Sequence, residues 1–75
     1  MFNVGSVVQF NEKHKWCGCF GFVTEVKVLE DDVRYMVGVP IPQRGTAYIF
    51  VMQSKNEIEF IGRSLFMPAK SDEDE

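Results

Sequence analysis

Two stretches near the N-terminus decide the fold, VGSVVQF at residues 4–10 and KHKWCGCFGFV at residues 13–23. The first stretch contains an expected strand at residues 6–10, whose alternating positions place Val8 and Phe10 on one face. The second begins as a polar, positively charged loop and continues through glycines into another apolar run. Together they predict a strand, a loop and a second strand, which form the opening hairpin of a small curled β-sheet.

The second strand is expected at residues 20–28, and its apolar pattern slips part-way along. Phe22 and Val26 share one face, whereas Val23 lies on the other. Gly21 lies beside this slip, and a glycine inside a strand is typical of a bulge or a strong bend. We therefore predict that the sheet bends at Gly21 and curls into a barrel.

Two further strands are expected at residues 33–39 and 46–52. The first alternates regularly, with Val33, Tyr35, Val37 and Val39 on one face, and should be half-buried. The PIPQRG sequence at 40–45 predicts that the ladder ends there, because proline cannot donate a hydrogen bond and glycine permits a turn. Residues 46–52 are apolar on both faces, which predicts a central strand.

The segment that follows has two interpretations. Residues 54–57 have the spacing of a helix capping box ahead of an apolar run. Residues 57–61 nevertheless alternate, and Gly62 would cost a helix about 1 kcal/mol. We expect a short strand at 57–61 and then one helical turn at 63–66, with a helix over this segment as the alternative.

Size and composition favour a single all-β domain. A chain of 75 residues is near the lower limit for folding unaided, so a closed or nearly closed barrel uses its strands best. There is no run of about 20 apolar residues and no signal peptide, from which we expect a cytoplasmic protein without membrane contact.

The acidic residues are concentrated at the C-terminus. Four of the 11 acidic residues occupy positions 72–75, which leaves seven against eight basic residues in the rest of the chain. We expect a folded domain at 1–68 followed by a disordered acidic tail at 69–75. A balanced body gives no electrostatic signature of a nucleic-acid-binding protein.

The opening hairpin resembles the KOW motif of SH3-like barrels. The matching positions in this chain are Gly5, Val8, Phe10, Lys13, Lys15, Gly18, Gly21, Val23 and Val26. The resemblance implies a small five-stranded SH3-like barrel. It also implies RNA or protein binding through the basic loop after the first strand, as in KOW modules of ribosomal proteins and transcription elongation factors. More loosely, the chain resembles short barrels encoded by bacteriophages.

The candidate binding residues fall in two groups. In Lys13-His14-Lys15-Trp16, two cations and an aromatic ring could hold a phosphate backbone and a base, or an acidic peptide; the alternative is a solvated loop with Trp16 closing the barrel end. The second group is Ile41, Arg44 and Tyr48, near the two prolines. Ile41 could be an exposed apolar knob, or it could cap the barrel.

The chain offers little for catalysis or metal binding. His14, Cys17 and Cys19 could supply three metal ligands, but a structural zinc site needs a fourth and the sequence has no other His or Cys. We expect reduced thiols, buried or half-buried beside a surface histidine, and neither a metal nor a cofactor. A small barrel filled by side chains leaves no pocket for a Cys–His nucleophile, so we expect no enzyme.

These observations together predict a non-catalytic binding module. A protein partner is the leading hypothesis, because the body is neutral and its loop edges are apolar. The alternative, from the resemblance, is a KOW-type RNA- or DNA-binding module. The sequence leaves the oligomeric state open.

Overall fold

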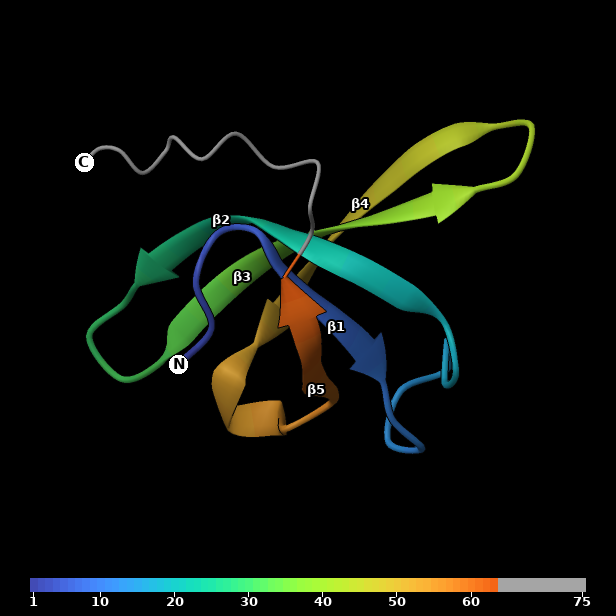
Figure 1. Ribbon diagram of the computed structural model, residues 1–75. Coiled ribbons are helices and arrows are strands. Elements are labelled where there is room, and N and C mark those ends of the chain that lie inside the picture. The colour runs from blue at the N-terminus through green and yellow to red at the C-terminus, as the bar shows by residue number, and fades with distance from the viewer. Residues whose placement is uncertain (64–75) are drawn as a thin grey trace.

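A computed structural model describes residues 1–63, which form one antiparallel sheet of five strands (Figure 1). The predicted all-β class is confirmed. The elements are β1 (Ser6–Phe10), β2 (Phe20–Val28), β3 (Val33–Ile41), β4 (Gly45–Met52), the short 3-10 helix η1 (Gln53–Lys55) and β5 (Ile58–Arg63). In the sheet they lie in the order β4-β3-β2-β1-β5, so β5 returns to pair with the first strand.

The inner face of the sheet encloses one hydrophobic core. Its buried side chains come from all five strands, which requires a sheet that curls round on itself. They are Val8, Phe10, Val23, Tyr35, Val37, Val39, Val51 and Ile58. The predicted inner faces of the first and third strands, set by Val8 with Phe10 and by Tyr35 with Val37, are therefore confirmed.

The pattern slip in β2 is a β-bulge, but it lies at Thr24 and not at Gly21. Pairing with β3 runs from Phe22 to Val23, skips one residue and resumes at Glu25. Gly21 instead faces the core, where an added Cβ would lie 2.6 Å from the Val37 Cγ1 atom and 3.0 Å from the Gly38 carbonyl oxygen. The glycine is needed because the neighbouring strand approaches closely. The predicted bulge therefore lies at Thr24 instead of beside Gly21.

The two prolines do not end the β3–β4 ladder where we expected. Pro40 pairs with Thr46 and Ile41 with Gly45, so β3 runs two residues further than predicted. Pairing of β3 with β2 already ends at Gly38. Proline is tolerated at a strand position that has lost one neighbour, since the missing N–H leaves no acceptor unpaired. The resulting hairpin extends beyond the rest of the molecule (Figure 1).

Strand β4 is an edge strand and not the central strand that its composition predicted. Its inner residues pack on the core as expected, with Val51 buried and Ile49 against the cluster. On its outer face, however, Tyr48 and Phe50 are 58% and 56% exposed. Burial within residues 1–63 therefore does not explain why the outer face of β4 is apolar.

The expected strand after β4 is confirmed as β5, which starts one residue later and ends two residues later than predicted. The capping-box segment forms η1, and Arg63, expected to begin a helical turn, is the last residue of β5. The rest of that turn, the domain boundary at residue 68 and the acidic tail lie outside the described residues. Within residues 1–63, no helix is long and apolar enough to cross a membrane.

Candidate functional site

The loop between β1 and β2 is held by its own hydrogen bonds and by packing of Trp16 on the core. The backbone N–H of Trp16 donates to His14 Nδ1 at 2.9 Å. The His14 ring is 4.5 Å from that of Phe10, and Trp16 meets Phe10 edge-on at 6.3 Å. Trp16 thus packs against the hydrophobic core, while Lys13 and Lys15 are exposed.

Gly18 ends this loop in a β-bulge. Its N–H donates to the Phe10 carbonyl, and the Phe10 N–H donates to the Cys19 carbonyl, so Gly18 and Cys19 both oppose Phe10. Gly18 has φ +94°, the left-handed conformation that this type of bulge requires. The thiols of Cys17 and Cys19 are free and exposed. The prediction that they are buried or half-buried is therefore wrong. Among residues 1–63, no three His, Cys, Asp or Glu side chains group in a way that could hold a metal ion.

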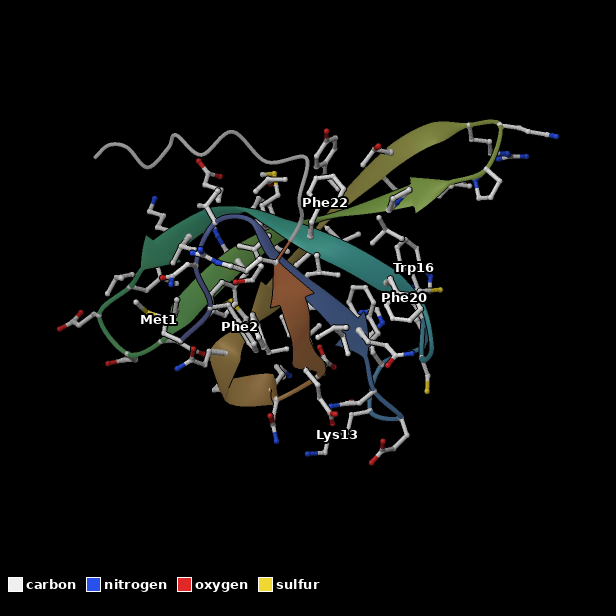
Figure 2. All side chains as sticks on the ribbon, viewed as in Figure 1. Met1, Phe2, Lys13, Trp16, Phe20 and Phe22 are labelled. Atoms are coloured by element: carbon white, nitrogen blue, oxygen red, sulfur yellow. The ribbon has the colours of Figure 1, made fainter. Side chains whose placement is uncertain are left out.

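The second predicted group lies along the β3–β4 hairpin. Ile41 is half-buried at the end of β3, Arg44 is exposed in the turn, and Tyr48 lies on the outer face of β4. The turn is closed by a hydrogen bond from the Arg44 N–H to the Ile41 carbonyl at 2.9 Å. The structure therefore separates the two predicted groups: Lys13 and Trp16 lie on the connection between β1 and β2 (Figure 2), and the second group lies along the β3–β4 hairpin.

That outer face carries the most distinctive surface of the described chain. Its strand register aligns apolar side chains in rows: Val7 opposes Phe22, which opposes Gly38, which opposes Tyr48. Met36 opposes Phe50 in the next row. We call this surface the aromatic wall and define it as Val7, Phe20, Phe22, Met36, Pro40, Tyr48 and Phe50.

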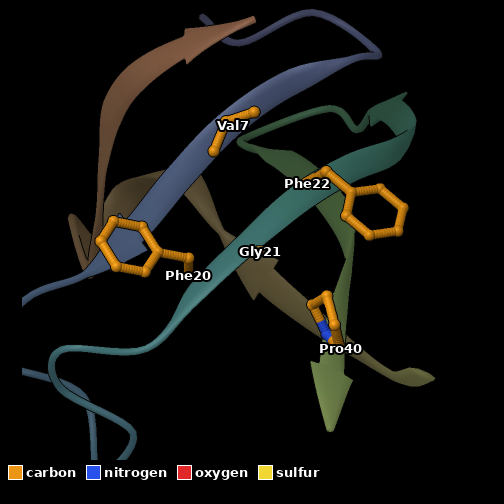
Figure 3. A pocket seen from close by; sticks show the side chains of 5 residues that line it. All are labelled: Val7, Phe20, Gly21, Phe22 and Pro40. Carbon is orange, nitrogen blue, oxygen red and sulfur yellow. The ribbon is translucent and has the colours of Figure 1, made fainter. Parts of the chain in front are cut away.

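The wall contains a shallow hollow of about 130 Å³. Figure 3 shows its lining, with Phe20 and Phe22 from β2 on either side of Gly21, Val7 from β1 and Pro40 from β3. Phe20 is 53% exposed, and it follows the β1–β2 loop directly in the chain. The hollow can accept an apolar side chain, and its lining supplies no acid, base or nucleophile.

Charged side chains adjoin the wall at its border, where Glu25 on β2 opposes Met36. The Arg34 guanidinium carbon lies 4.4 Å from the centre of the Phe50 ring, a cation–π contact. Arg34 opposes Lys27 on β2, whereas Arg44 lies at the far end of β3 and β4. The basic side chains are therefore divided between the two ends of the sheet and do not form one patch.

A second polar contact fixes the turn after β2 to η1. The Asp32 carboxylate accepts a hydrogen bond from the Ser54 hydroxyl at 2.5 Å and from the Ser54 N–H at 3.1 Å. It also accepts the Val33 N–H at 2.8 Å. These donors, the Ser54 hydroxyl foremost, lower the pKa of Asp32 because they stabilise its ionised form.

Comparison with known proteins gives no match to a family model, to a curated protein or to a solved structure. The function must therefore be argued from the surface itself. Sequence reasoning identified Tyr48 but missed Phe20, Phe22 and Phe50. The sequence signal was a pair of aromatic residues separated by one position, Phe20 with Phe22 and Tyr48 with Phe50. In each of these two strands, the other face already contributes residues to the core.

Proposed function

We propose that this chain is a non-catalytic binding module that holds a protein partner on the aromatic wall. The observation that carries the proposal is the exposure of Phe20, Tyr48 and Phe50, which are 53%, 58% and 56% exposed on one face. Large aromatic side chains are costly to leave in water and are enriched at the centres of protein interfaces. The partner segment we propose is apolar, with one side chain in the hollow beside Gly21.

The proposed fold identity is an SH3-like barrel with a KOW-like opening hairpin. Support comes from the strand order, in which β5 pairs with β1, and from the short 3-10 turn that precedes β5. Within the hairpin, Val8, Phe10 and Val23 belong to the core and Gly18 forms the bulge before β2. Trp16 departs from a simple RNA-contacting loop, because it packs inward.

A photo-crosslinking experiment in cells tests the protein-binding proposal. The photoreactive residue p-benzoylphenylalanine replaces Tyr48 in one variant and Phe60 in the control. Both positions are 58% exposed, but Phe60 on β5 is outside the wall and opposes Val8, a core residue. We expect a discrete adduct with a different protein at position 48 that survives nuclease and is absent at position 60. Equal labelling from both positions, or adducts to nucleic acid alone, would overturn the proposal.

The second candidate is RNA or DNA binding by the loop between β1 and β2. It is favoured by the exposure of Lys13 and Lys15 and by the exposed ring of Phe20 at the loop exit. Such binding should weaken steeply with added salt. Fluorescence anisotropy with a labelled single-stranded RNA or DNA, comparing wild type with a Lys13→Ser/Lys15→Ser variant, tests it. Binding that does not depend on salt or on these lysines would exclude this function.

A further inference from the structure

We propose that β4 is a dimerisation edge, at which two copies of this chain pair antiparallel with Ile49 opposite Ile49 of the second copy. The inference goes beyond the proposed protein-binding function and does not depend on it, because pairing uses the backbone edge of β4 and leaves the outer face of the wall available. It starts from the difference between the two edges of the sheet.

The two edge strands differ in how well they are protected against pairing. Strand β5 has six residues, carries Glu59 and Arg63 and contains a register shift opposite Val7 and Val8. Charges, short length and bulges are the features by which proteins block edge-to-edge association. Strand β4 has eight residues, GTAYIFVM, without a charge or a proline, and it pairs with β3 without a register shift. Within residues 1–63, its outer edge has no neighbouring strand.

The backbone groups that β4 presents at this edge can be assigned from Pro40. Pro40 has no N–H, so its pair with Thr46 cannot be a hydrogen-bonded pair of the β3–β4 ladder. Hydrogen-bonded and non-hydrogen-bonded pairs alternate along the ladder, so Met36, four residues before Pro40, also lacks hydrogen bonds to β4. In agreement, its carbonyl accepts the Thr24 hydroxyl from β2 at 3.1 Å, on the side away from β4. In this alternation, the backbone N–H and C=O groups of Ala47, Ile49 and Val51 point toward β3. The edge-facing residues are Thr46, Tyr48, Phe50 and Met52.

This assignment selects one register. In a two-fold antiparallel pair, centring on Ile49 places Tyr48 opposite Phe50 of the second copy and Thr46 opposite its Met52. All four edge-facing residues then form hydrogen-bonded pairs, whereas centring on Tyr48 or on Phe50 leaves one of them without a partner inside the strand. The chosen register also makes two aromatic cross-strand pairs, which stabilise a sheet.

The charges at the ends of the strand are compatible with this pairing. Arg44 precedes β4, and Ser54, hydrogen-bonded to Asp32, follows it. The antiparallel register brings each Arg44 to the end of the strand at which Asp32 of the second copy lies. The dimer would join two sheets and continue the aromatic wall across both chains.

The test measures the solution mass of the full chain in reducing buffer, by sedimentation from about 10 μM to about 1 mM. Reduction excludes disulfides through the exposed Cys17 and Cys19. We expect the mass to rise from 8.6 kDa toward twice that value. The Tyr48→Lys/Phe50→Lys variant places like charges opposite each other and should raise the midpoint concentration about tenfold or more.

Two further variants make the test specific to this edge and register. Tyr48→Lys/Phe50→Glu places opposite charges together across the pair and should restore dimerisation relative to the double lysine variant. Phe60→Lys, at an equally exposed site on β5, should leave the midpoint unchanged, and circular dichroism confirms that each variant is folded. A monomer throughout the range, or a dimer that resists the double lysine variant, would overturn the proposal.

Discussion

The ring of Phe22 lies across the backbone of Gly38 on the neighbouring strand, so that an added Cβ at Gly38 would come within 3.0 Å of the Phe22 Cζ atom. Gly38 is itself opposite Tyr48 on β4. The absence of a side chain at Gly38 therefore lets the Phe22 ring lie flat in the aromatic wall, between the strands that carry Val7 and Tyr48. The shape of the wall depends on this glycine.

Gly38→Ala should change the wall more than the fold. The added methyl would push aside the ring of Phe22 and the Thr46 methyl group, which is 3.2 Å from the Cβ position. Phe22 is partly exposed and can rotate, so we expect a loss of only about 1 kcal/mol in the free energy of unfolding. Urea denaturation measures the loss, and crosslinking from position 48 should fall. An unchanged crosslink would show that the partner does not use this part of the wall.

Gly21→Ala should destabilise the protein much more than Gly62→Ala. A Cβ at Gly21 would meet Val37, which is fully buried, and the Gly38 carbonyl oxygen, whereas one at Gly62 has nothing within 4 Å. We expect a loss of about 2–3 kcal/mol at Gly21 and under about 0.5 kcal/mol at Gly62. Both free energies of unfolding can be measured by urea denaturation. Equal values for the two variants would contradict the close-approach role of Gly21.

The contrast at Gly21 shows how far the sequence can predict this fold. The alternating pattern correctly places the bounds of β1 and β2, because period-two hydrophobicity is a local property. It does not distinguish a glycine that bends a strand from one that admits a neighbour. That distinction depends on Val37, which is 16 positions away in the sequence and adjacent only in the sheet.

The candidate site was harder to predict for a related reason. Phe20, Phe22 and Phe50 are strand aromatics, and such residues are usually core. The sequence shows that both faces of β4 are apolar but does not show that the strand lies at an edge. Lys13 and Trp16 were predicted as candidate binding residues because loops often carry function. In the structure, Trp16 packs on the core.

Tyr35→Phe should weaken the attachment of the N-terminal segment and of η1 to the core. The buried Tyr35 hydroxyl donates to the Gln53 Oε1 atom in η1 and accepts the Phe2 N–H at 3.1 Å. Removing it leaves these partners unsatisfied, and we expect a loss of about 1–2 kcal/mol in the free energy of unfolding. Tyr48→Phe is the matched control, since Tyr48 is 58% exposed. Equal effects of the two changes, by thermal or urea denaturation, would argue against these contacts.

Gln43→Gly should stabilise the β3–β4 turn. Gln43 has φ +69°, a left-handed conformation that strains a residue with a side chain but not glycine. The gain is reduced by the greater freedom of glycine in the unfolded chain, so we expect a net increase of up to about 1 kcal/mol in the free energy of unfolding. Arg44→Gly, at a neighbouring position without positive φ, should instead be neutral or destabilising. A gain at Arg44 alone would contradict the assignment of strain to Gln43.

Acid should weaken the contact between Asp32 and Ser54. The Ser54 hydroxyl, then the Val33 N–H, lower the pKa of Asp32 in the folded protein. A lowered folded pKa means that the stabilisation is complete above the unfolded pKa, about 4 for aspartate, and is lost as the pH falls through the folded value. Ser54→Ala removes the foremost cause. The difference in unfolding free energy between wild type and Ser54→Ala should therefore be constant from about pH 7 to about pH 5 and shrink below about pH 4. Lys55→Ala, which leaves this contact intact, should show no such trend. A wild-type advantage over Ser54→Ala that persists undiminished in acid would mean that the hydroxyl does not act through the ionised carboxylate.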